Sequence, residues 1–224
     1  MLDEQLAPIS TAVGDYLKAI WQVAGSEPAA TGDIARELGV TAPSVTGMLG
    51  KLAAMELIRY QPYRGAELTD AGRAEALRLI RRHRLLETFL IRDLGFGWDE
   101  VHQEAERMEH AMSERFTERL AQHLGQPTFD PHGDPIPRRD GSLPDGPDTP
   151  LVDAADGDRF EVHRVLSQDS LVLAYLAGLD IEPGRILRVV AREPLGNLLM
   201  LRSGERHVSL SKELATMILG SVKR

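Results

Sequence analysis

The stretch TGDIARELGVTAPSVTGMLGKLAAM, residues 31–55, predicts two short helices around a tight turn. The first helix ends at Gly39, because glycine adopts the backbone conformations of tight turns at little cost. Thr41 is placed to cap the second helix, and Pro43 falls in its first turn, where a missing N–H is tolerated. This helix-turn-helix pattern is typical of DNA-binding domains.

The sequence on either side extends this motif into a winged helix-turn-helix. Before it, a helix that begins at Ser10 or Thr11 carries apolar residues at helical spacing. After it, residues 57–60 and 66–68 predict a β-hairpin, or wing, with its turn over Pro62 to Gly65.

Two longer helices are predicted next, from Asp70 to Asp93 and from Asp99 to about Leu124. Their apolar side chains exceed what one thin helical pair can hide, so we expect a partner subunit to cover them. These side chains are Leu79, Ile80, Leu86, Phe89, Leu90, Val101, Met108, Met112 and Phe116. The basic run of Arg78, Arg81, Arg82 and Arg84 is interpreted as a solvated helix face.

The remainder of the chain predicts a small β domain. Residues 126–150 are rich in Pro, Asp and Gly and are interpreted as a linking segment. Short apolar strands are expected at 160–162, 186–190, 198–201 and 207–210. Short helices near 170–179 and 212–219 interrupt them, and a barrel-like arrangement fits this pattern.

Composition narrows the class of protein. The chain has 224 residues, no cysteine and a net charge of −8, so disulfides and thiolate ligands are excluded. It has no apolar run of membrane-spanning length, and residues 1–10 lack the features of a signal peptide, so we expect a cytoplasmic protein without a membrane partner. The negative charge argues against a general nucleic-acid coat but permits a local basic patch that binds DNA.

Histidine and glutamate recur at helical spacing in the two long helices. Residues four or seven apart share a helix face, so each helix presents imidazoles and carboxylates together. The two sets are His83 with Glu87, and His102 with Glu106, Glu109 and His110. On consecutive antiparallel helices they predict a site for a divalent cation.

Other interpretations of these residues remain open from spacing alone. Glu106 and Glu109 also fit a solvated acidic face, and His83 fits a core histidine with a backbone partner. If a cation does bind, imidazole and carboxylate donors without sulfur suit Mn(II) or Fe(II). Such a site can also hold Zn(II), Co(II) or Cd(II) in vitro.

Taken in order along the chain, these motifs resemble the diphtheria-toxin-repressor family of metal-dependent transcription regulators. The likeness covers essentially the whole chain. It rests on 41–46, the wing, His83-xxx-Glu87, His102-xxx-Glu106-xx-Glu109-His110 and PHGDPIP at 131–137. The resemblance implies an α+β, mainly α chain. Its expected parts are a winged helix-turn-helix domain over 1–75, a helical dimerisation and metal-binding domain over 76–140, a linker over 141–150 and an SH3-like, FeoA-like small β-barrel over 151–224.

The resemblance also assigns ligands. One family site matches His83, Glu87 and His102, with Asp169 of the C-terminal domain as the nearest match to a further ligand. The other site matches Asp15, Glu106, Glu109 and His110. In iron-responsive members a methionine and a cysteine stand at the positions of Asp15 and Glu106. Carboxylates at both positions match the manganese-responsive branch, so the resemblance implies Mn(II) first and Fe(II) second.

The family further implies a homodimer on a palindromic operator in double-stranded DNA. Candidate DNA contacts are Thr41, Pro43, Ser44, Thr46 and Lys51 of the second helix and Arg59, Tyr63 and Arg64 of the wing. Ordinary hairpin packing is the alternative for Tyr63, and a solvated surface role is the alternative for Lys51.

The function expected is a repressor that Mn(II) activates for operator binding, by joining the first helix of the DNA-binding domain to the helix of Glu106–His110. An Fe(II)-responsive repressor of the same family and a winged-helix regulator of an organic ligand are the alternatives. A metallohydrolase is a further alternative, but the sequence contains no nucleophile motif. An interaction protein that docks peptides on its β domain would bind no duplex.

Overall fold

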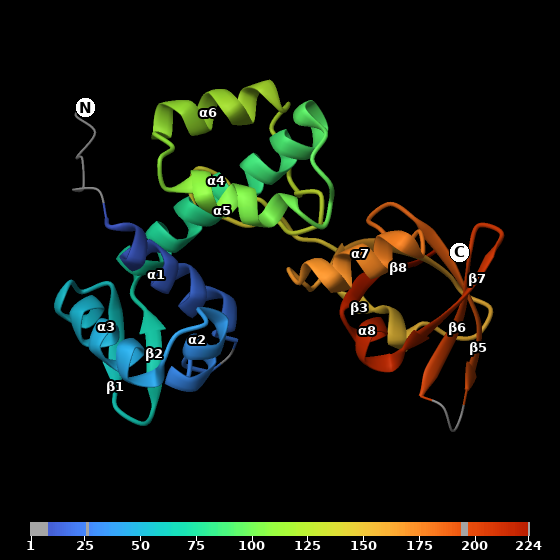
Figure 1. Ribbon diagram of the computed structural model, residues 1–224, viewed down its shortest axis with the longest axis horizontal. Coiled ribbons are helices and arrows are strands. Elements are labelled where there is room, and N and C mark those ends of the chain that lie inside the picture. The colour runs from blue at the N-terminus through green and yellow to red at the C-terminus, as the bar shows by residue number, and fades with distance from the viewer. Residues whose placement is uncertain (1–8, 26, 194–196, 224) are drawn as a thin grey trace. The chain divides into compact units, whose positions relative to one another are not determined.

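The computed structural model describes residues 9–25, 27–193 and 197–223. Residues 1–8, on which the expectation of no signal peptide depends, lie outside this range. The chain forms two compact units. The first comprises residues up to Arg82 together with Pro137–Ser142, and the second comprises His83–Ile136 together with the chain from Leu143 onward. Figure 1 shows the order of the elements.

The first unit is a winged helix-turn-helix, as predicted. Thr41 caps α3, because its side chain accepts a hydrogen bond from the backbone N–H of Ser44. Gly39 has a φ of +62° in the turn between the two short helices. The elements are α1 (Thr11–Val23), α2 (Thr31–Glu37), α3 (Ala42–Ala54), β1 (Ile58–Gln61) and β2 (Gly65–Leu68). The core side chains include Val13, Leu17, Ile20, Ile34, Val45, Leu49 and Leu52, all at most 1% exposed.

The predicted helix from Asp99 to Leu124 is wrong in one respect, because it is two helices. α4 (Asp70–Leu94) has the expected length, whereas α5 (Val101–Glu109) ends well before α6 (Glu114–His123) begins. Ser113 causes the second start, since its side chain accepts the backbone N–H of Phe116 and so competes with helix continuation. His110 consequently lies at the C-cap of α5.

The basic run in α4 is not simply a solvated face. Arg81 and Arg84 are buried and donate hydrogen bonds to the backbone carbonyls of Pro137 and Pro135, respectively. Arg84 also forms ion pairs with Asp130 and Asp134, at 3.6 and 3.5 Å. These guanidinium groups hold the segment after α6 against α4.

Residues 130–136 are part of the packed structure and not a free linker, which corrects the interpretation of 126–150 as linking sequence. Asp130 Oδ1 accepts the backbone N–H groups of His132 and Asp134, at 2.8 and 2.9 Å. His132 and Ile136 are at most 1% exposed. Gly133 has a φ of +85°, and a Cβ there would lie 1.8 Å from the carbonyl oxygen of His163.

The C-terminal part of the second unit is a six-stranded antiparallel sheet in the order β3-β8-β4-β5-β6-β7. The strands are β3 (Thr149–Pro150), β4 (Arg159–Val165), β5 (Ile186–Glu193), β6 (Leu198–Ser203), β7 (Arg206–Ser211) and β8 (Ile218–Lys223). A 3-10 turn η1 (Leu151–Asp153) and the helices α7 (Ser170–Gly178) and α8 (Lys212–Thr216) complete it. The helix expected to reach residue 219 ends at Thr216, because the chain turns into β8, which pairs with β4.

Alternate residues of these strands build the core of the domain. Phe160, Val162, Leu187, Val189 and Leu201 are at most 1% exposed, while their neighbours along each strand face outward. No helix among the described residues is long and apolar enough to cross a membrane.

Gly133→Ala should reduce the free energy of unfolding by about 2–4 kcal/mol, because the Cβ meets the His163 carbonyl oxygen and the backbone is left-handed. Gly157→Ala is the matched control, since Gly157 also has a positive φ, of +91°, but nothing within 4 Å of the added Cβ. Denaturant unfolding of both variants measures the difference. Equal losses would contradict this packing role of Gly133.

Candidate metal centre

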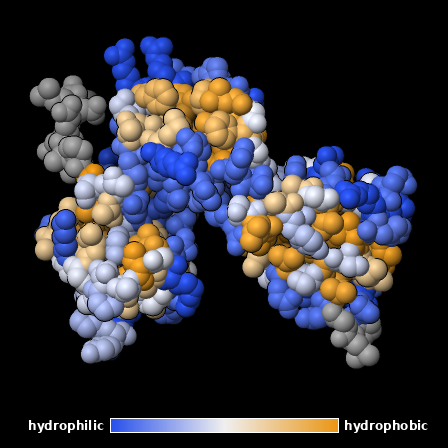
Figure 2. Space-filling view, viewed as in Figure 1, coloured by the Kyte–Doolittle hydropathy of each residue, from blue (hydrophilic) through white to orange (hydrophobic). Residues whose placement is uncertain are grey.

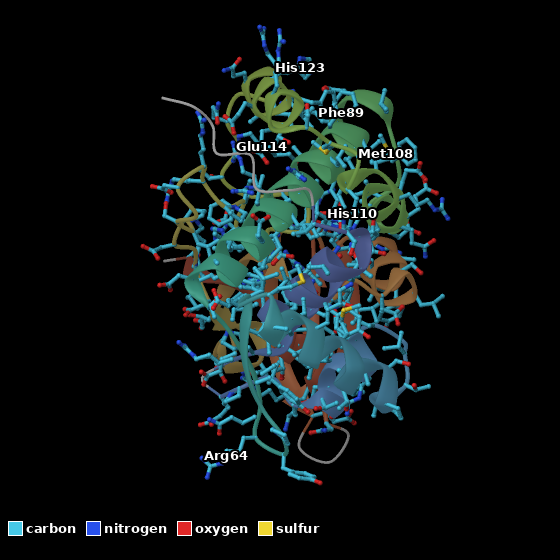
Figure 3. The ribbon with its side chains drawn as sticks, turned by 90° about the vertical axis from the view of Figure 1, so that its left-hand side faces the viewer. Arg64, Phe89, Met108, His110, Glu114 and His123 are labelled. Carbon is cyan, nitrogen blue, oxygen red and sulfur yellow. The ribbon has the colours of Figure 1, made fainter. Side chains whose placement is uncertain are left out.

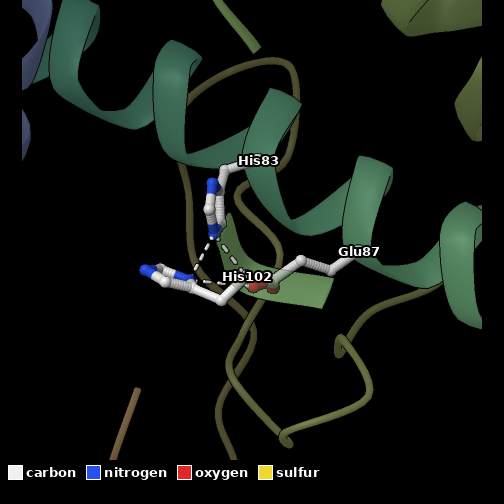
Figure 4. A group of neighbouring side chains, drawn as sticks. All are labelled: His83, Glu87 and His102. Carbon is white, nitrogen blue, oxygen red and sulfur yellow. Dashed lines mark hydrogen bonds and ion pairs between the residues drawn. The ribbon is translucent and has the colours of Figure 1, made fainter. Parts of the chain in front are cut away.

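His83 and Glu87, which are buried, form a cluster with the partly buried His102 (Figure 4). α4 supplies His83 and Glu87 from one face, and α5 supplies His102. Glu87 Oε1 lies 2.9 Å from His83 Nε2 and 3.1 Å from His102 Nδ1, and the two imidazole nitrogens are 2.9 Å apart. Three donor atoms that converge in this way match the ligand set expected of a divalent cation site.

The two ligand sets that the sequence separates are in contact. His83 Nδ1 lies 2.5 Å from Glu109 Oε2, and His102 Nε2 lies 3.5 Å from Glu106 Oε1. Both ring nitrogens of His83 therefore face side chains. This excludes the alternative of a core histidine with a backbone partner. Glu109 Oε1 is also 3.6 Å from His110 Nε2. The imidazoles and carboxylates of α5 are thus connected through His83 and Glu87 of α4.

The charges of this cluster compensate one another. Burial opposes protonation of His102, but hydrogen bonds to Glu106 and Glu87 and the charges of both carboxylates outweigh it and raise the pKa to about 9. Burial likewise opposes protonation of His83, whose pKa is nevertheless raised by Glu87 and Glu109. Burial favours a neutral Glu87, yet the His83 charge and the neighbouring imidazoles hold its pKa well below the usual range. Protons on the imidazoles thus supply the positive charge that a cation would supply.

Glu87 takes part in a second group that helical spacing did not predict. Its other oxygen, Oε2, lies 3.8 Å from His132 Nδ1, and Asp130 completes a buried set of possible ligands. Glu87 Oε2, His132 Nδ1 and Asp130 Oδ2 are all buried without a hydrogen-bond partner. Burial, together with the charges of Glu87 and Asp134, raises the pKa of Asp130 to about 8.

The orientation of His132 suits a ligand. Its Nε2 is 2.9 Å from the carbonyl oxygen of Trp98, which can only accept, so Nε2 carries the hydrogen. In the neutral ring the lone pair is then on Nδ1, which faces Glu87. His132 belongs to the PHGDPIP motif at 131–137, so this motif was the available sequence signal for the group.

The remaining predicted ligands lie as follows. Asp15 is half-buried on α1 of the first unit, whereas Glu106, Glu109 and His110 belong to the second unit. Asp169 is the N-cap of α7, where its Oδ1 accepts the backbone N–H of Leu171 at 2.8 Å. None of the clusters of possible ligands among the described residues includes Asp169.

All the predicted DNA contacts are exposed residues of the first unit. Tyr63, at the tip of the hairpin, is fully exposed, which excludes hairpin packing as its role. Arg64 follows it in the sequence, and Figure 3 shows the Arg64 side chain pointing away from the ribbon. The other exposed candidates are Thr41, Pro43, Ser44, Thr46 and Lys51 of α3 and Arg59 of β1.

Known families match three consecutive parts of the chain. Residues 9–66 match the iron dependent repressor N-terminal DNA binding domain, and 69–138 match the iron dependent repressor metal binding and dimerisation domain. Residues 149–222 match the FeoA domain.

Relatives resemble the chain over most of its length. The iron-dependent repressor IdeR of Mycobacterium leprae (strain TN) is 33% identical over 195 residues, which are 81% of this chain and 84% of that protein. A manganese-dependent transcriptional repressor in complex with manganese is 39% identical, with a TM-score of 0.85 over 94% of this chain and 100% of that one. ScaR with bound Zn2+ is 32% identical, with a TM-score of 0.80 over 93% and 98% of the two chains.

The chain therefore belongs to the iron-dependent repressor family, which includes the diphtheria toxin repressor. It is a metal-dependent, DNA-binding transcriptional repressor and not an enzyme. Its helical DNA-binding and dimerisation domains precede a C-terminal FeoA domain, as the sequence predicts.

The affinity for Mn(II) should increase with pH between about 6.5 and 8.5, by up to about tenfold per unit for each proton displaced, because ligation requires neutral imidazoles. In the metal-free protein the free energy of unfolding depends on pH in the opposite direction. The raised pKa of His102, about 9, stabilises the fold fully below about pH 6.5, and this contribution is lost as the pH rises toward 9.

Anaerobic calorimetric titration at several pH values measures this dependence. His102→Gln should flatten it, whereas His123→Gln should not, because His123 is exposed and pairs only with Asp93 in the described ion pairs. A Mn(II) affinity that does not change with pH would contradict the assignment of His102 as a ligand.

Proposed function

We propose that this repressor of the iron-dependent repressor family is activated by Mn(II) and acts in the cytoplasm as a homodimer on a palindromic operator in double-stranded DNA. The observation that carries the proposal is the donor set. The clustered residues offer imidazole and carboxylate atoms, and the chain has no cysteine. Such donors suit Mn(II), with Fe(II) second, whereas Zn(II), Co(II) and Cd(II) can substitute in vitro.

The residues present fit a bound cation. One buried oxygen of Glu87 and one of Asp130 lack a hydrogen-bond partner, and the nitrogens of His132 and Arg84 approach them only to 3.8 and 3.6 Å. A cation in direct contact would offset the cost of burying these atoms. Glu87 and Glu109 both pair with His83 and raise its pKa in the metal-free protein. A divalent cation supplies concentrated positive charge, and it thereby frees the imidazoles to act as neutral ligands.

We assign two ligand sets for this ion. His83, Glu87 and His102 form the first, and Asp15, Glu106, Glu109 and His110 form the second. Support for the second set comes from the family likeness and from the proximity of Glu109 to His110 within α5 and its C-cap. Glu87, Asp130 and His132 are a further candidate set. Each has one buried atom without a hydrogen-bond partner that could bind a metal ion. We do not assign Asp169 a ligand role ahead of its capping role.

Asp15 couples the ion to DNA in this proposal. It lies on α1, which packs in the core of the DNA-binding unit next to the helix-turn-helix. Without a cation, the carboxylates of Asp15, Glu106 and Glu109 repel one another. This repulsion disfavours the arrangement in which they bind one ion together. With the repulsion offset, α1 is fixed, and the recognition helices of the dimer can match major grooves about 34 Å apart.

A second copy of the chain covers the apolar surface of the helical domain in this proposal. Phe116, Met108 and Leu94 are 49%, 39% and 58% exposed. Figure 2 shows hydrophobic side chains gathered over α6. Such a patch is typical of an interface. We place the domain limits near residues 75, 140 and 150, with the DNA-binding domain first and the FeoA-like domain last.

A mobility-shift titration on the operator with Mn(II), Fe(II), Zn(II) and EDTA tests the proposal. The operator should shift with Mn(II) at the lowest metal concentration and should not shift with EDTA. A shift that is indifferent to chelators would favour a regulator of an organic ligand, and a shift with Fe(II) below the Mn(II) threshold would favour the iron-responsive alternative.

Asp15→Ala should abolish the metal stimulation of operator binding, a loss of about 5- to 150-fold, while the dimer stays folded. Glu37→Ala is the control, because Glu37 is an exposed carboxylate on α2 of the same unit. Fluorescence anisotropy with and without Mn(II) gives the stimulation ratio of each variant. Full stimulation of Asp15→Ala would disprove the coupling role of Asp15.

Glu106→Cys should move the metal ranking from Mn(II) toward Zn(II) and Fe(II), because a thiolate favours softer ions. Glu104→Cys, two residues away on α5, introduces the same thiol outside the proposed ligand set and should leave the ranking unchanged. Operator binding as a function of each metal measures both. The assignment of Glu106 fails if the two variants behave alike.

A further inference from the structure

The outer face of the C-terminal sheet carries a row of basic side chains. Arg159 of β4 pairs in register with Arg188 of β5 on one side and with Lys223 of β8 on the other. Arg188 pairs with Arg202 of β6, and Arg202 pairs with His207 of β7. Directly paired residues point to the same face of a sheet, so the row crosses five adjacent strands.

All five side chains of this basic row are exposed. The residues that alternate with them, such as Phe160, Leu187 and Leu201, are buried, which fixes the row on the solvent side. Strands in a sheet are about 4.8 Å apart, so the row extends over roughly 19 Å. Figure 1 shows β5, β6 and β7 side by side in this domain.

Little negative charge compensates the row within the described residues. Glu161 forms an ion pair with Lys223 at 2.5 Å. The described residues include no ion-pair or side-chain hydrogen-bond partner for Arg159, Arg188, Arg202 or His207. Like charges directly opposite one another destabilise a sheet, and the chain as a whole has a net charge of −8. An arrangement that costs stability in an acidic protein points to an anionic partner.

We propose that the basic row binds the phosphate backbone of duplex DNA, as a second, sequence-independent contact beside the helix-turn-helix. Guanidinium groups match phosphate in a bidentate manner, and arginine makes up the three central members of the row. DNA bound by the first unit is tethered to the same molecule, so even a weak second contact is used at high effective concentration.

The composition of the domain favours backbone contact over base recognition. Its only Phe, Tyr or Trp residues between 151 and 224 are Phe160, which is buried, and Tyr175, which lies on α7. The row therefore offers no aromatic platform on which unpaired bases stack, and single-stranded nucleic acid is not the partner. Duplex phosphates need only the cations.

The test compares two triple variants of the full chain. Arg159→Gln, Arg188→Gln and Arg202→Gln together remove the centre of the row. Arg185→Gln, Arg206→Gln and Lys212→Gln remove the same charge from the same domain outside the row. Affinity for the operator with long duplex flanks and for a non-operator duplex is measured by anisotropy over a series of salt concentrations, with Mn(II) present.

The row variant should bind both duplexes at least tenfold more weakly at low salt. Its slope of log K against log salt should be less steep by about 0.9 for each phosphate that the row no longer neutralises, or about 2.7 for three phosphates. The control should keep the wild-type slope. Equal slopes for the two variants would overturn the proposal, as would a defect confined to binding of an acidic protein or to self-association.

Arg188→Glu separates a binding role from a structural one. The carboxylate would lie between Arg159 and Arg202, so the thermal unfolding midpoint should rise while DNA affinity falls. A lower midpoint together with weaker binding would indicate damage to the sheet and would contradict the proposal. Because binding to the non-operator duplex is followed through its salt dependence and not through metal stimulation, this readout does not depend on whether Mn(II) is the activating ion.

Discussion

The second unit depends on compensation of the negative charge on the buried carboxylate of Glu87. It is in contact with His83 of its own helix and with His102 of α5, and it faces His132 of the following segment. An isolated buried carboxylate is strongly destabilising, so these elements must supply positive charge together. In the metal-free protein this charge resides in protonated imidazoles, and in the proposed active form it resides in a cation.

The same constraint connects the helices to the C-terminal domain. Arg84, one turn from Glu87 on α4, pairs with Asp130 and Asp134. Asp134 in turn pairs with Arg164 of β4 and accepts a hydrogen bond from Gln168 at 3.3 Å. Glu87 is therefore close to the segment 130–136, which the FeoA domain contacts through Arg164 and Gln168. No residue of that domain lies in a cluster of possible ligands among the described residues.

The sequence predicted those parts of the fold and site that depend on local spacing. Thr41 and Gly39 identify the helix-turn-helix, and His83 and Glu87 align because they are one helical turn apart. It did not predict features that depend on distant partners. Asp130 and His132 join Glu87 across more than forty residues, and Ser113 divides a helix whose apolar pattern continues. The strand β8 was missed for the same reason, since its register depends on β4.

Anomalous diffraction at the manganese absorption edge, on crystals grown with Mn(II), would locate the ion that activates the repressor. We expect a peak in contact with the carboxylates of Asp15 and Glu109 and with the imidazole of His110, so that one ion joins the two units. Manganese found only beside His83, Glu87 and His102, with no ion at Asp15, would contradict it.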